Sequence, residues 1–192
     1  MVVFWNFTLY SFLGFLLEVA YAHATGGRPN RKCLRVLPLC PVYGIGACLI
    51  LFFSALAKEY PPALFFLGAF TATAVEYLTA AFYETVLGVS FWDYSDLPGN
   101  LHGRVCLPFS LAWGVLTLPL VYWLHPLFSA ALAAIPAPVS WTALAALAVD
   151  ALLSAARVRA GMSEAEWEAY TGISSEEMRR KIERLTPIRI GK

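Results

Sequence analysis

Long, nearly unbroken runs of apolar residues alternate along this chain with short polar segments. A helix needs about 20 mainly apolar residues to cross roughly 30 Å of hydrocarbon. Five runs meet this requirement, and we predict that each forms a membrane-spanning helix. They cover residues 2–23, 36–57, 63–87, 105–124 and 139–156. The expected fold is therefore an all-α membrane protein with about five transmembrane helices.

The part of the chain between Arg104 and Arg157 holds two of these runs. His125 and Asp150 are its only Asp, Glu, Lys, Arg or His residues, and three prolines lie in the connection. A hairpin of two helices therefore fits better than one span. The apolar piece 127–135 is too short to cross, so we predict an interfacial or re-entrant segment there.

Tryptophan and tyrosine residues gather near the predicted helix ends, where an aromatic belt anchors a membrane protein at both interfaces. These residues are Trp5, Tyr60, Trp92, Tyr94, Tyr122, Trp123 and Trp141. We interpret them mainly as interface anchors, with contact to a ligand as the alternative.

The composition agrees with a membrane location, because 59% of the residues are apolar and 14% are charged, against about 45–50% and about 25% in soluble domains. The net charge of +1 provides no basic surface for nucleic acid. The sequence also lacks the spacings of a phosphate-binding loop, a nucleophile elbow and a zinc-protease helix. We therefore predict no nucleic-acid partner, no cofactor and no hydrolysis of ATP by the chain itself.

Cysteine usage indicates neither a disulfide framework nor a metal site. The four cysteines are Cys33, Cys40, Cys48 and Cys106. They lack the paired spacing of a zinc ribbon or a secreted disulfide scaffold. The topology brings three of them to one membrane face with His23 and His102, but no close cysteine pair supports a soft-metal site. We predict that the cysteines are small buried hydrophobes.

The charge distribution predicts the orientation in the membrane. Residues 26–35 carry four basic residues and no acid, whereas Lys58 is the only basic residue in the connection after the second helix. Positively charged connections stay on the cytoplasmic side, so the N-terminus is expected outside. Five crossings then place the tail, with Arg157 and Arg159 at its start, in the cytoplasm. We expect the protein in a bacterial inner membrane.

The last part of the chain, residues 159–192, has a soluble composition. Two serine–glutamate pairs match the spacing of capping boxes, which predicts two short helices. The pairs are Ser163 with Glu166 and Ser174 with Glu177. We expect a transmembrane bundle over residues 1–158 and a soluble helical cytoplasmic tail, which either folds back on the bundle or presents a docking surface.

An internal repeat emerges when the sequence is shifted by 70 positions. The aligned residues are Asn30 with Asn100, Leu37-Pro38 with Leu107-Pro108, Cys40 with Ser110, and Tyr43-Gly44 with Trp113-Gly114. We predict a parallel tandem repeat of two-helix units, residues 2–57 and 63–124, with the helix at 139–156 as an extra element. The pseudo-twofold axis would lie near the membrane normal, with a site between the copies.

Four acidic residues lie within predicted spans, where a carboxylate at the helix centre costs about 2.5–3.5 kcal/mol. They are Glu18, Glu76, Glu84 and Asp150. We predict that the three glutamates face one interior cavity and bind a substrate, a cation or a proton, with Glu76 the deepest. The alternative for each is a structural hydrogen bond to a neighbouring helix. In the repeat, Glu18 corresponds to Glu84 if the connection of the second unit has a short insertion, and to Glu76 if it has a longer one. The shorter insertion, and so Glu84, is the simpler choice.

The segment 91–104 is the most site-like stretch between two spans. Its candidate ligands are Asp93, Asp96, Asn100, His102 and Arg104. Such groups could bind an ion or a polar head group. Equally, Asp and Asn side chains satisfy local backbone amides in turns, so a purely structural turn is the alternative.

Six strings of the sequence carry a family resemblance. They are residues 10–18 (YSFLGFLLE), 40–44 (CPVYG), 76–79 (EYLT), 91–95 (FWDYS), 100–104 (NLHGR) and 109–114 (FSLAWG). In these strings the chain resembles small bacterial membrane proteins described as ABC transporter permeases of the CmpB type, over roughly residues 4–126. The last helix and the tail lie outside this resemblance. The resemblance implies a membrane subunit that works with a separate ATPase.

Taken together, these features favour an integral membrane transport protein or substrate-binding permease subunit for a small molecule or an ion. Its polar intramembrane site would open to the cytoplasm. One alternative is a membrane-embedded enzyme acting on a lipid head group, with Asp93, Asp96 and His102 as acid, base or metal ligands. Another alternative is a non-catalytic regulatory membrane subunit.

Overall fold

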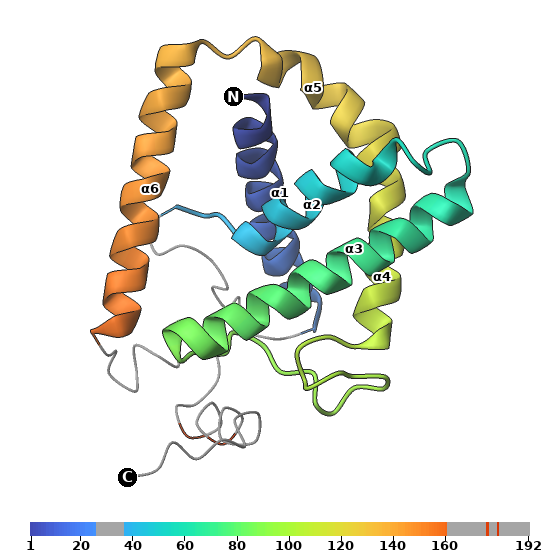
Figure 1. Ribbon diagram of the computed structural model, residues 1–192, viewed down its shortest axis with the longest axis vertical. Coiled ribbons are helices and arrows are strands. Elements are labelled where there is room, and N and C mark those ends of the chain that lie inside the picture. Colours follow the sequence, from blue (N-terminus) through green and yellow to red (C-terminus); the bar gives the residue numbers. More distant parts are fainter. Residues whose placement is uncertain (26–36, 161–175, 177–179, 181–192) are drawn as a thin grey trace.

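The computed structural model describes residues 1–25 and 37–160, together with residues 176 and 180. Within this part every regular element is a helix, which confirms the all-α class (Figure 1). The helices are α1 (Val2–Thr25), α2 (Pro41–Ser54), α3 (Pro61–Phe82), α4 (Leu107–Pro119), α5 (His125–Ala133) and α6 (Ala137–Arg159). Two π-helical turns, η1 (Tyr83–Leu87) and η2 (Leu120–Leu124), continue α3 and α4. The predicted capping boxes of the tail lie outside the described residues.

Four helical segments of the described chain are long and apolar enough to cross a membrane. They are Val2–Thr25, Pro61–Leu87, Leu107–Ala133 and Ala137–Arg157. The fifth apolar helix, α2, has 14 residues and therefore spans only about 21 Å at 1.5 Å per residue. It begins later than the predicted run 36–57, because Pro41 occupies its first turn and Cys40 before it is extended. A residue that precedes proline avoids the α region.

The apolar piece 127–135 is not a separate element, because residues 127–133 belong to α5, which ends the 27-residue apolar segment Leu107–Ala133. Its interfacial or re-entrant position in the membrane stays a prediction. Pro119 and Pro126 cannot donate backbone hydrogen bonds, but the π-helical turn η2 between them keeps the backbone helical. Figure 1 shows the bend that results between α4 and α5.

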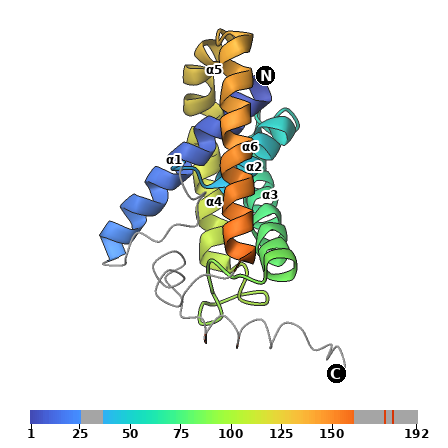
Figure 2. The same ribbon diagram turned by 90° about the vertical axis from the view of Figure 1, so that its left-hand side faces the viewer.

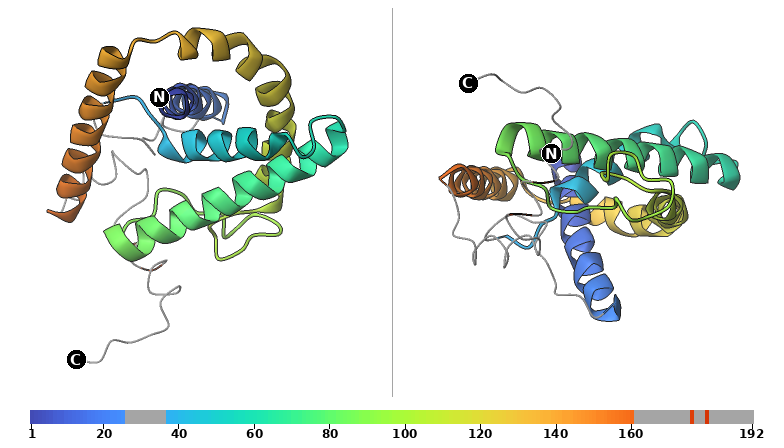
Figure 3. Two further views of the ribbon diagram at one scale, coloured as in Figure 1. Left: turned by 45° about the horizontal axis from the view of Figure 1, so that its top comes forward. Right: turned by 90° about the horizontal axis from the view of Figure 1, so that it is seen from below.

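Several connections lie at two opposite ends of the molecule, whereas the connection between α2 and α3 lies at its side (Figure 1). The N-terminus and the α5–α6 connection lie at one end, whereas the segment 88–106 and the end of α6 lie at the other (Figures 1 and 2). Neighbouring helices pack in chain order, α1 on α2, α2 on α3, and α3 on α4. Figure 3 shows α1 leaving the layer in which α3, α4 and α6 lie. Helices α3, α4–α5 and α6 run in alternating directions, as successive membrane crossings require.

The outer faces of the helices expose large apolar side chains. Phe66 and Phe70 on α3 are 68% and 78% exposed, and Leu152 on α6 is 71% exposed. Water would make such surfaces unfavourable, whereas lipid is their natural solvent. The described chain is therefore a multi-pass membrane protein whose outer surface contacts lipid.

The helix α6 stands beside the bundle and is attached to it by polar contacts. Trp5 Nε1 donates to Ser140 Oγ at 2.8 Å. The backbone N–H of Leu37, just before α2, donates to Asp150 Oδ2 at 2.8 Å. Asp150 is 5% exposed, so it faces the protein, as its position in a span required.

Candidate functional site

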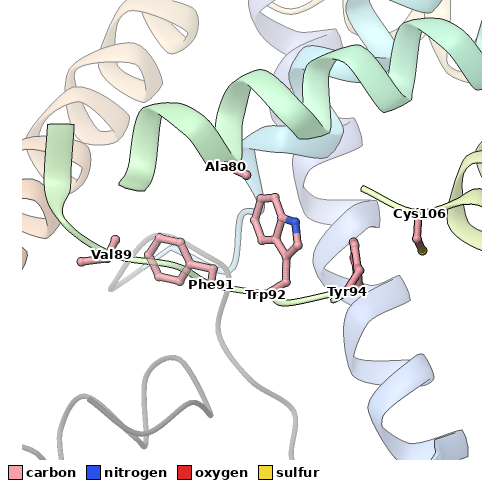
Figure 4. Close-up of a cluster of buried hydrophobic side chains, with 6 residues drawn as sticks. All are labelled: Ala80, Val89, Phe91, Trp92, Tyr94 and Cys106. Carbon is pink, nitrogen blue, oxygen red and sulfur yellow. The ribbon is translucent and has the colours of Figure 1, made fainter. Parts of the chain in front are cut away.

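The segment 88–106 folds back under α3 and closes one end of the bundle. Phe91, Trp92 and Tyr94 point from it into a buried cluster that also contains Ala80 and Cys106 (Figure 4). Trp92 and Tyr94 are 6% and 9% exposed, so the prediction that these two anchor the membrane interface is wrong. Trp92 Nε1 instead donates to the Arg104 carbonyl oxygen at 2.8 Å, which fixes both ends of the segment.

A tight turn reverses the chain within this segment. His102 and Gly103 adopt left-handed conformations, with φ of 55° and 64°, and the Arg104 N–H donates to the Leu101 oxygen at 3.1 Å. Two consecutive residues with positive φ are typical of the turn that joins tightly paired strands. The turn places the side chain of Arg104 toward α3.

The predicted ligands Asp93 and Asn100 shape the segment itself. Asp93 Oδ1 accepts hydrogen bonds from the backbone N–H and the hydroxyl of Ser95, at 2.9 and 2.6 Å. Asn100 Nδ2 donates to the oxygens of Ser95 and Leu97, both at 3.0 Å. These contacts match the alternative of a structural turn.

Arg104 forms an ion pair with Glu84 at the junction of this segment with α3. Its Nε and one terminal nitrogen both lie 2.8 Å from Glu84 Oε2, and its other terminal nitrogen donates to the Tyr77 hydroxyl at 2.9 Å. Burial acts to lower the pKa of Arg104, but the hydrogen bond to Glu84 and its negative charge outweigh burial and raise the pKa. His102 Nδ1 lies 3.0 Å from the same Tyr77 hydroxyl.

Aromatic side chains donate hydrogen bonds to Glu18 and Glu76. The Tyr43 hydroxyl donates to Glu18 Oε1 at 2.6 Å. Glu76 accepts from the Tyr94 hydroxyl at 3.0 Å and from Trp113 Nε1 at 2.9 Å. Burial, followed by the charge of Glu76, raises the pKa of Tyr94, so its hydroxyl keeps the proton that it donates.

A cavity of about 300 Å³, here called the bundle cavity, lies between α1, α2, α3 and α4. Glu18 and Glu76 both line it, and they are the only charged residues among the described residues of its wall. The remaining wall is mostly aliphatic and aromatic and includes Trp92 and Trp113, and Trp113 contacts Glu76. Gly46 also lines it, and a Cβ added there would meet open space.

A second cavity, the loop cavity, has a volume of about 560 Å³ and lies beside the segment 88–106. Asp93 and Asp96 line it. Five residues line both cavities, namely Leu17, Glu18, Tyr43, Trp113 and Leu116. The rings of Tyr43 and Trp113 meet edge to face with centroids 5.3 Å apart. The two cavities therefore adjoin at this aromatic pair and at Glu18.

The structure brings together some of the predicted site residues and separates others. Glu18 and Glu76 share the bundle cavity, whereas Glu84 lines neither cavity and binds Arg104. The expectation that all three glutamates face one cavity is therefore wrong for Glu84. Asn100, His102, Arg104 and Asp150 line neither cavity.

The aromatic partners of the two carboxylates were missed by reasoning from the sequence. Tyr43 and Trp113 occupied equivalent positions in the proposed repeat, and that equivalence was the one available signal for them. Their contacts add to it, because Glu18 binds Tyr43 as Glu76 binds Trp113. These contacts favour Glu76 as the counterpart of Glu18, in place of the simpler choice Glu84, while the repeat itself stays a prediction.

The packing of the helix pairs follows the same register. A Cβ added to Gly44 would overlap Phe7, and one added to Gly114 would overlap Phe65. Phe7 and Phe65 precede Glu18 and Glu76 by the same number of residues. Glycine is needed at both positions because the helices approach each other closely there.

The cysteines differ from one another. Cys40, fully buried before α2, takes part in a disulfide bond, which the spacing of the cysteines did not lead us to expect. Cys48 and Cys106 are free. Within the described ranges no group of three or more His, Cys, Asp or Glu residues is arranged to hold a metal ion.

Comparison with protein families matches residues 5–155 to the CmpB family, described as "Putative ABC-transporter type IV". The chain belongs to this family. The match includes most of α6, so the family extends beyond the residues 4–126 in which we saw the resemblance, and the last helix is part of it. No curated protein and no solved structure matches the chain.

Proposed function

We propose that this member of the CmpB family is the membrane subunit of a transport system and that the bundle cavity holds its substrate. One observation carries the proposal: two carboxylates that are costly to keep in a membrane line a cavity of about 300 Å³ at the centre of four helices. This volume lies at the lower end of the range of small-molecule sites. Polar groups placed at such a cost in a span are by default functional.

The two cavities supply a route for the substrate. The loop cavity adjoins the segment 88–106, which lies on the cytoplasmic side in the proposed orientation, and it meets the bundle cavity at Tyr43 and Trp113. Separation of these two rings would join the cavities. We infer that the site opens to the cytoplasm by this route and that a separate ATPase subunit, as the family description suggests, acts on the same side.

The alternative of a lipid-modifying enzyme receives no support from the described contacts. Asp93 binds Ser95 within its own turn, and His102 lies outside the loop cavity that contains Asp93 and Asp96. These three residues therefore do not line a common cavity, as an acid, a base and a metal ligand would have to do.

Filling the bundle cavity tests the proposed function. Gly46→Leu adds a side chain that enters open space and improves helix propensity, since glycine costs about 1 kcal/mol relative to alanine. The variant should therefore fold at least as well as the wild type. The protein in lipid nanodiscs is incubated with a metabolite extract of the expressing bacterium, and retained compounds are identified by mass spectrometry and tested for flux in proteoliposomes.

Ile45→Phe is the matched control, because it enlarges the neighbouring residue of α2, which is 40% exposed on the outer face. We expect the wild type and this control to retain and transport the same compounds, and Gly46→Leu to do neither. Equal retention and flux in all three proteins, or no retention by the wild type, would show that the cavity is not a transport site.

A further inference from the structure

We propose that Tyr10 and His125 form an outer gate of the bundle cavity, and that this gate opens when α5 moves about the π-helical turn η2. The inference rests on the transport function proposed above, because a transport site has to open to each side of the membrane in turn. The loop cavity adjoins one end of the bundle cavity, and the contact between Tyr10 and His125 lies at the other end.

The bundle cavity ends at this contact. Of the described residues that line it, Tyr10 is the one on α1 nearest to the N-terminus, and Leu124, the last residue of η2, is its counterpart on the other wall. His125 follows Leu124, and its Nδ1 lies 3.3 Å from the Tyr10 hydroxyl. The N-terminus and the α5–α6 connection lie at this end of the molecule, opposite to the segment 88–106 (Figure 1). In the proposed orientation the gate therefore faces outward.

The ring of Tyr10 fills the space between the helices at this end. Tyr10 is 4% exposed, and it forms a buried cluster with Ala47 and Ile50 of α2 and with Leu120 of η2. The hydroxyl of the same residue binds the first residue of α5. A ligand can pass this end of the cavity only if one of these elements moves.

The packing indicates that α5 is the element that moves. Helix α4 is fixed to α3, because a Cβ added to Gly68 would overlap Thr117, which is 1% exposed. In contrast, α5 has no buried residue. Between them lies η2, flanked by Pro119 and Pro126. Prolines donate no backbone hydrogen bond, and helices bend most readily at prolines and π-helical turns.

A buried polar group beyond the gate also favours an opening to water. Asn6 precedes Tyr10 by about one helical turn and shares its face of α1. It is 9% exposed, and its side-chain oxygen has no hydrogen-bond partner in the described part of the chain. A buried acceptor without a partner raises the free energy of the closed state. Water that enters when the gate opens would satisfy this acceptor.

The rate at which a thiol on the cavity wall reacts from outside tests the gate. Ala72→Cys places that thiol on α3, in the wall of the bundle cavity. Intact cells are treated with the membrane-impermeant reagent methanethiosulfonate ethyltrimethylammonium. Mass spectrometry of the peptides then quantifies modification at position 72 separately from the native cysteines. Tyr10→Phe keeps the ring and removes the hydroxyl. Loss of one hydrogen bond shifts an equilibrium by about two- to tenfold, so this variant should accelerate the reaction by that factor.

Further variants show whether the two residues act through their contact. His125→Phe should accelerate the reaction by a similar factor, and the double variant with Tyr10→Phe by no more than either single variant. Tyr60→Phe, at a tyrosine that is 63% exposed, is the matched control for the loss of a hydroxyl and should leave the rate unchanged. Phe70→Cys, on the same helix at a position that is 78% exposed, is the control for the thiol, and Tyr10→Phe should not accelerate its reaction.

These rates are measured without a substrate, so they test the gate separately from the proposed function. Equal rates at position 72 with and without the Tyr10 hydroxyl would overturn the inference. Equal acceleration at positions 70 and 72 would also overturn it, because it would indicate a general loosening of the helices. Acceleration confined to inverted membrane vesicles would place the opening on the cytoplasmic side and refute an outer gate. The expected acceleration, together with no retention of any compound by the wild type, would uphold the gate and refute the transport site.

Discussion

The buried glutamates Glu76 and Glu84 differ in their described partners. Glu84 binds the guanidinium of Arg104, whereas Glu76 binds a phenol and an indole. The guanidinium of a buried ion pair compensates the charge of the carboxylate, and removal of either partner is strongly destabilising. The ion pair gives Glu84 a structural role, and the place of Glu76 on the wall of the bundle cavity keeps it as the candidate binding residue.

The structural role of Glu84 leads to a prediction for its partner. Arg104→Gln removes the guanidinium from a pair whose side chains are 13% and 4% exposed, and should lower the free energy of unfolding by about 3–5 kcal/mol. The double variant Glu84→Gln with Arg104→Gln should recover more than half of the loss, because both charges are then gone. Unfolding in detergent by increasing SDS, followed by circular dichroism, measures these changes.

The exposed pair Arg180–Glu176 is the control for this cycle. Its side chains are 62% and 76% exposed and 3.7 Å apart, so Arg180→Gln should change the stability by less than about 1 kcal/mol. A loss at Arg104 no larger than that at Arg180 would mean that the buried pair does not stabilise the fold.

At the scale of elements, the segment 88–106 is held in place by its backbone conformation as well as by its aromatic residues. Gly88 and Gly103 both have positive φ, of 68° and 64°, a conformation that costs most other residues about 1–2 kcal/mol. They differ in surroundings. A Cβ at Gly88 would meet open space, whereas one at Gly103 would press on Asp93 Oδ1 and Ser95 Oγ.

This difference predicts unequal effects of the same substitution. Gly88→Ala should cost only the conformational penalty of about 1–2 kcal/mol. Gly103→Ala should cost more and should also break the contact between Asp93 and Ser95, because the added methyl group displaces both side chains. Hydrogen exchange of the segment 88–106, measured by mass spectrometry, should accelerate strongly for Gly103→Ala and little for Gly88→Ala. Equal acceleration would show that the packing around Gly103 is loose.

The helices themselves show how far hydropathy alone reaches. Four of the five predicted runs correspond to long helices, because twenty or so consecutive apolar residues are stable in lipid only when their backbone groups are paired within the helix. The ends of the helices depended on proline. Pro41 delays the start of the second helix. The fourth helix continues through the π-helical turn between Pro119 and Pro126 into α5, beyond its predicted end at residue 124.

At the scale of the whole molecule, the orientation in the membrane is the main proposal still to be tested. In a cysteine-free background, Pro98→Cys and Tyr60→Cys place thiols at exposed positions near opposite ends of α3. A membrane-impermeant maleimide should label position 60 in intact cells and position 98 only in inverted membrane vesicles, because the basic connections stay inside. Leu64→Cys, at a residue with 0% exposure, should remain unlabelled on either side. Labelling of 60 and 98 from the same side would contradict the topology.

The proposed repeat also belongs to this scale. Glu18 contacts Tyr43, and Glu76 contacts Trp113. Each contact joins the first and the second helix of one repeat unit, and all four residues line the bundle cavity. A tandem repeat produces such paired contacts because both copies fold by the same interactions. The helix α6 lies outside both units. It carries Asp150, but none of its described residues lines either cavity.

By itself, the sequence determined the class of the fold and the positions at which an acidic side chain is costly to keep in the membrane. Long apolar runs imply helices in lipid, and an acid within such a run must face protein or water, because a carboxylate has no favourable contact with hydrocarbon. These rules need only the local chain. They correctly identified four long apolar helices and indicated that Glu18, Glu76 and Asp150 would find polar partners.

Only the tertiary structure decided which acid has which partner. Glu76 and Glu84 lie eight residues apart on one helix, and their sequence surroundings are equally apolar. The path of the segment 88–106 brings Arg104 to one of them and Tyr94 to the other. Such pairings depend on the turn at Gly103 and on the approach of α4 to α3. Contacts between residues distant in the chain follow from packing, and no local pattern of residues encodes them.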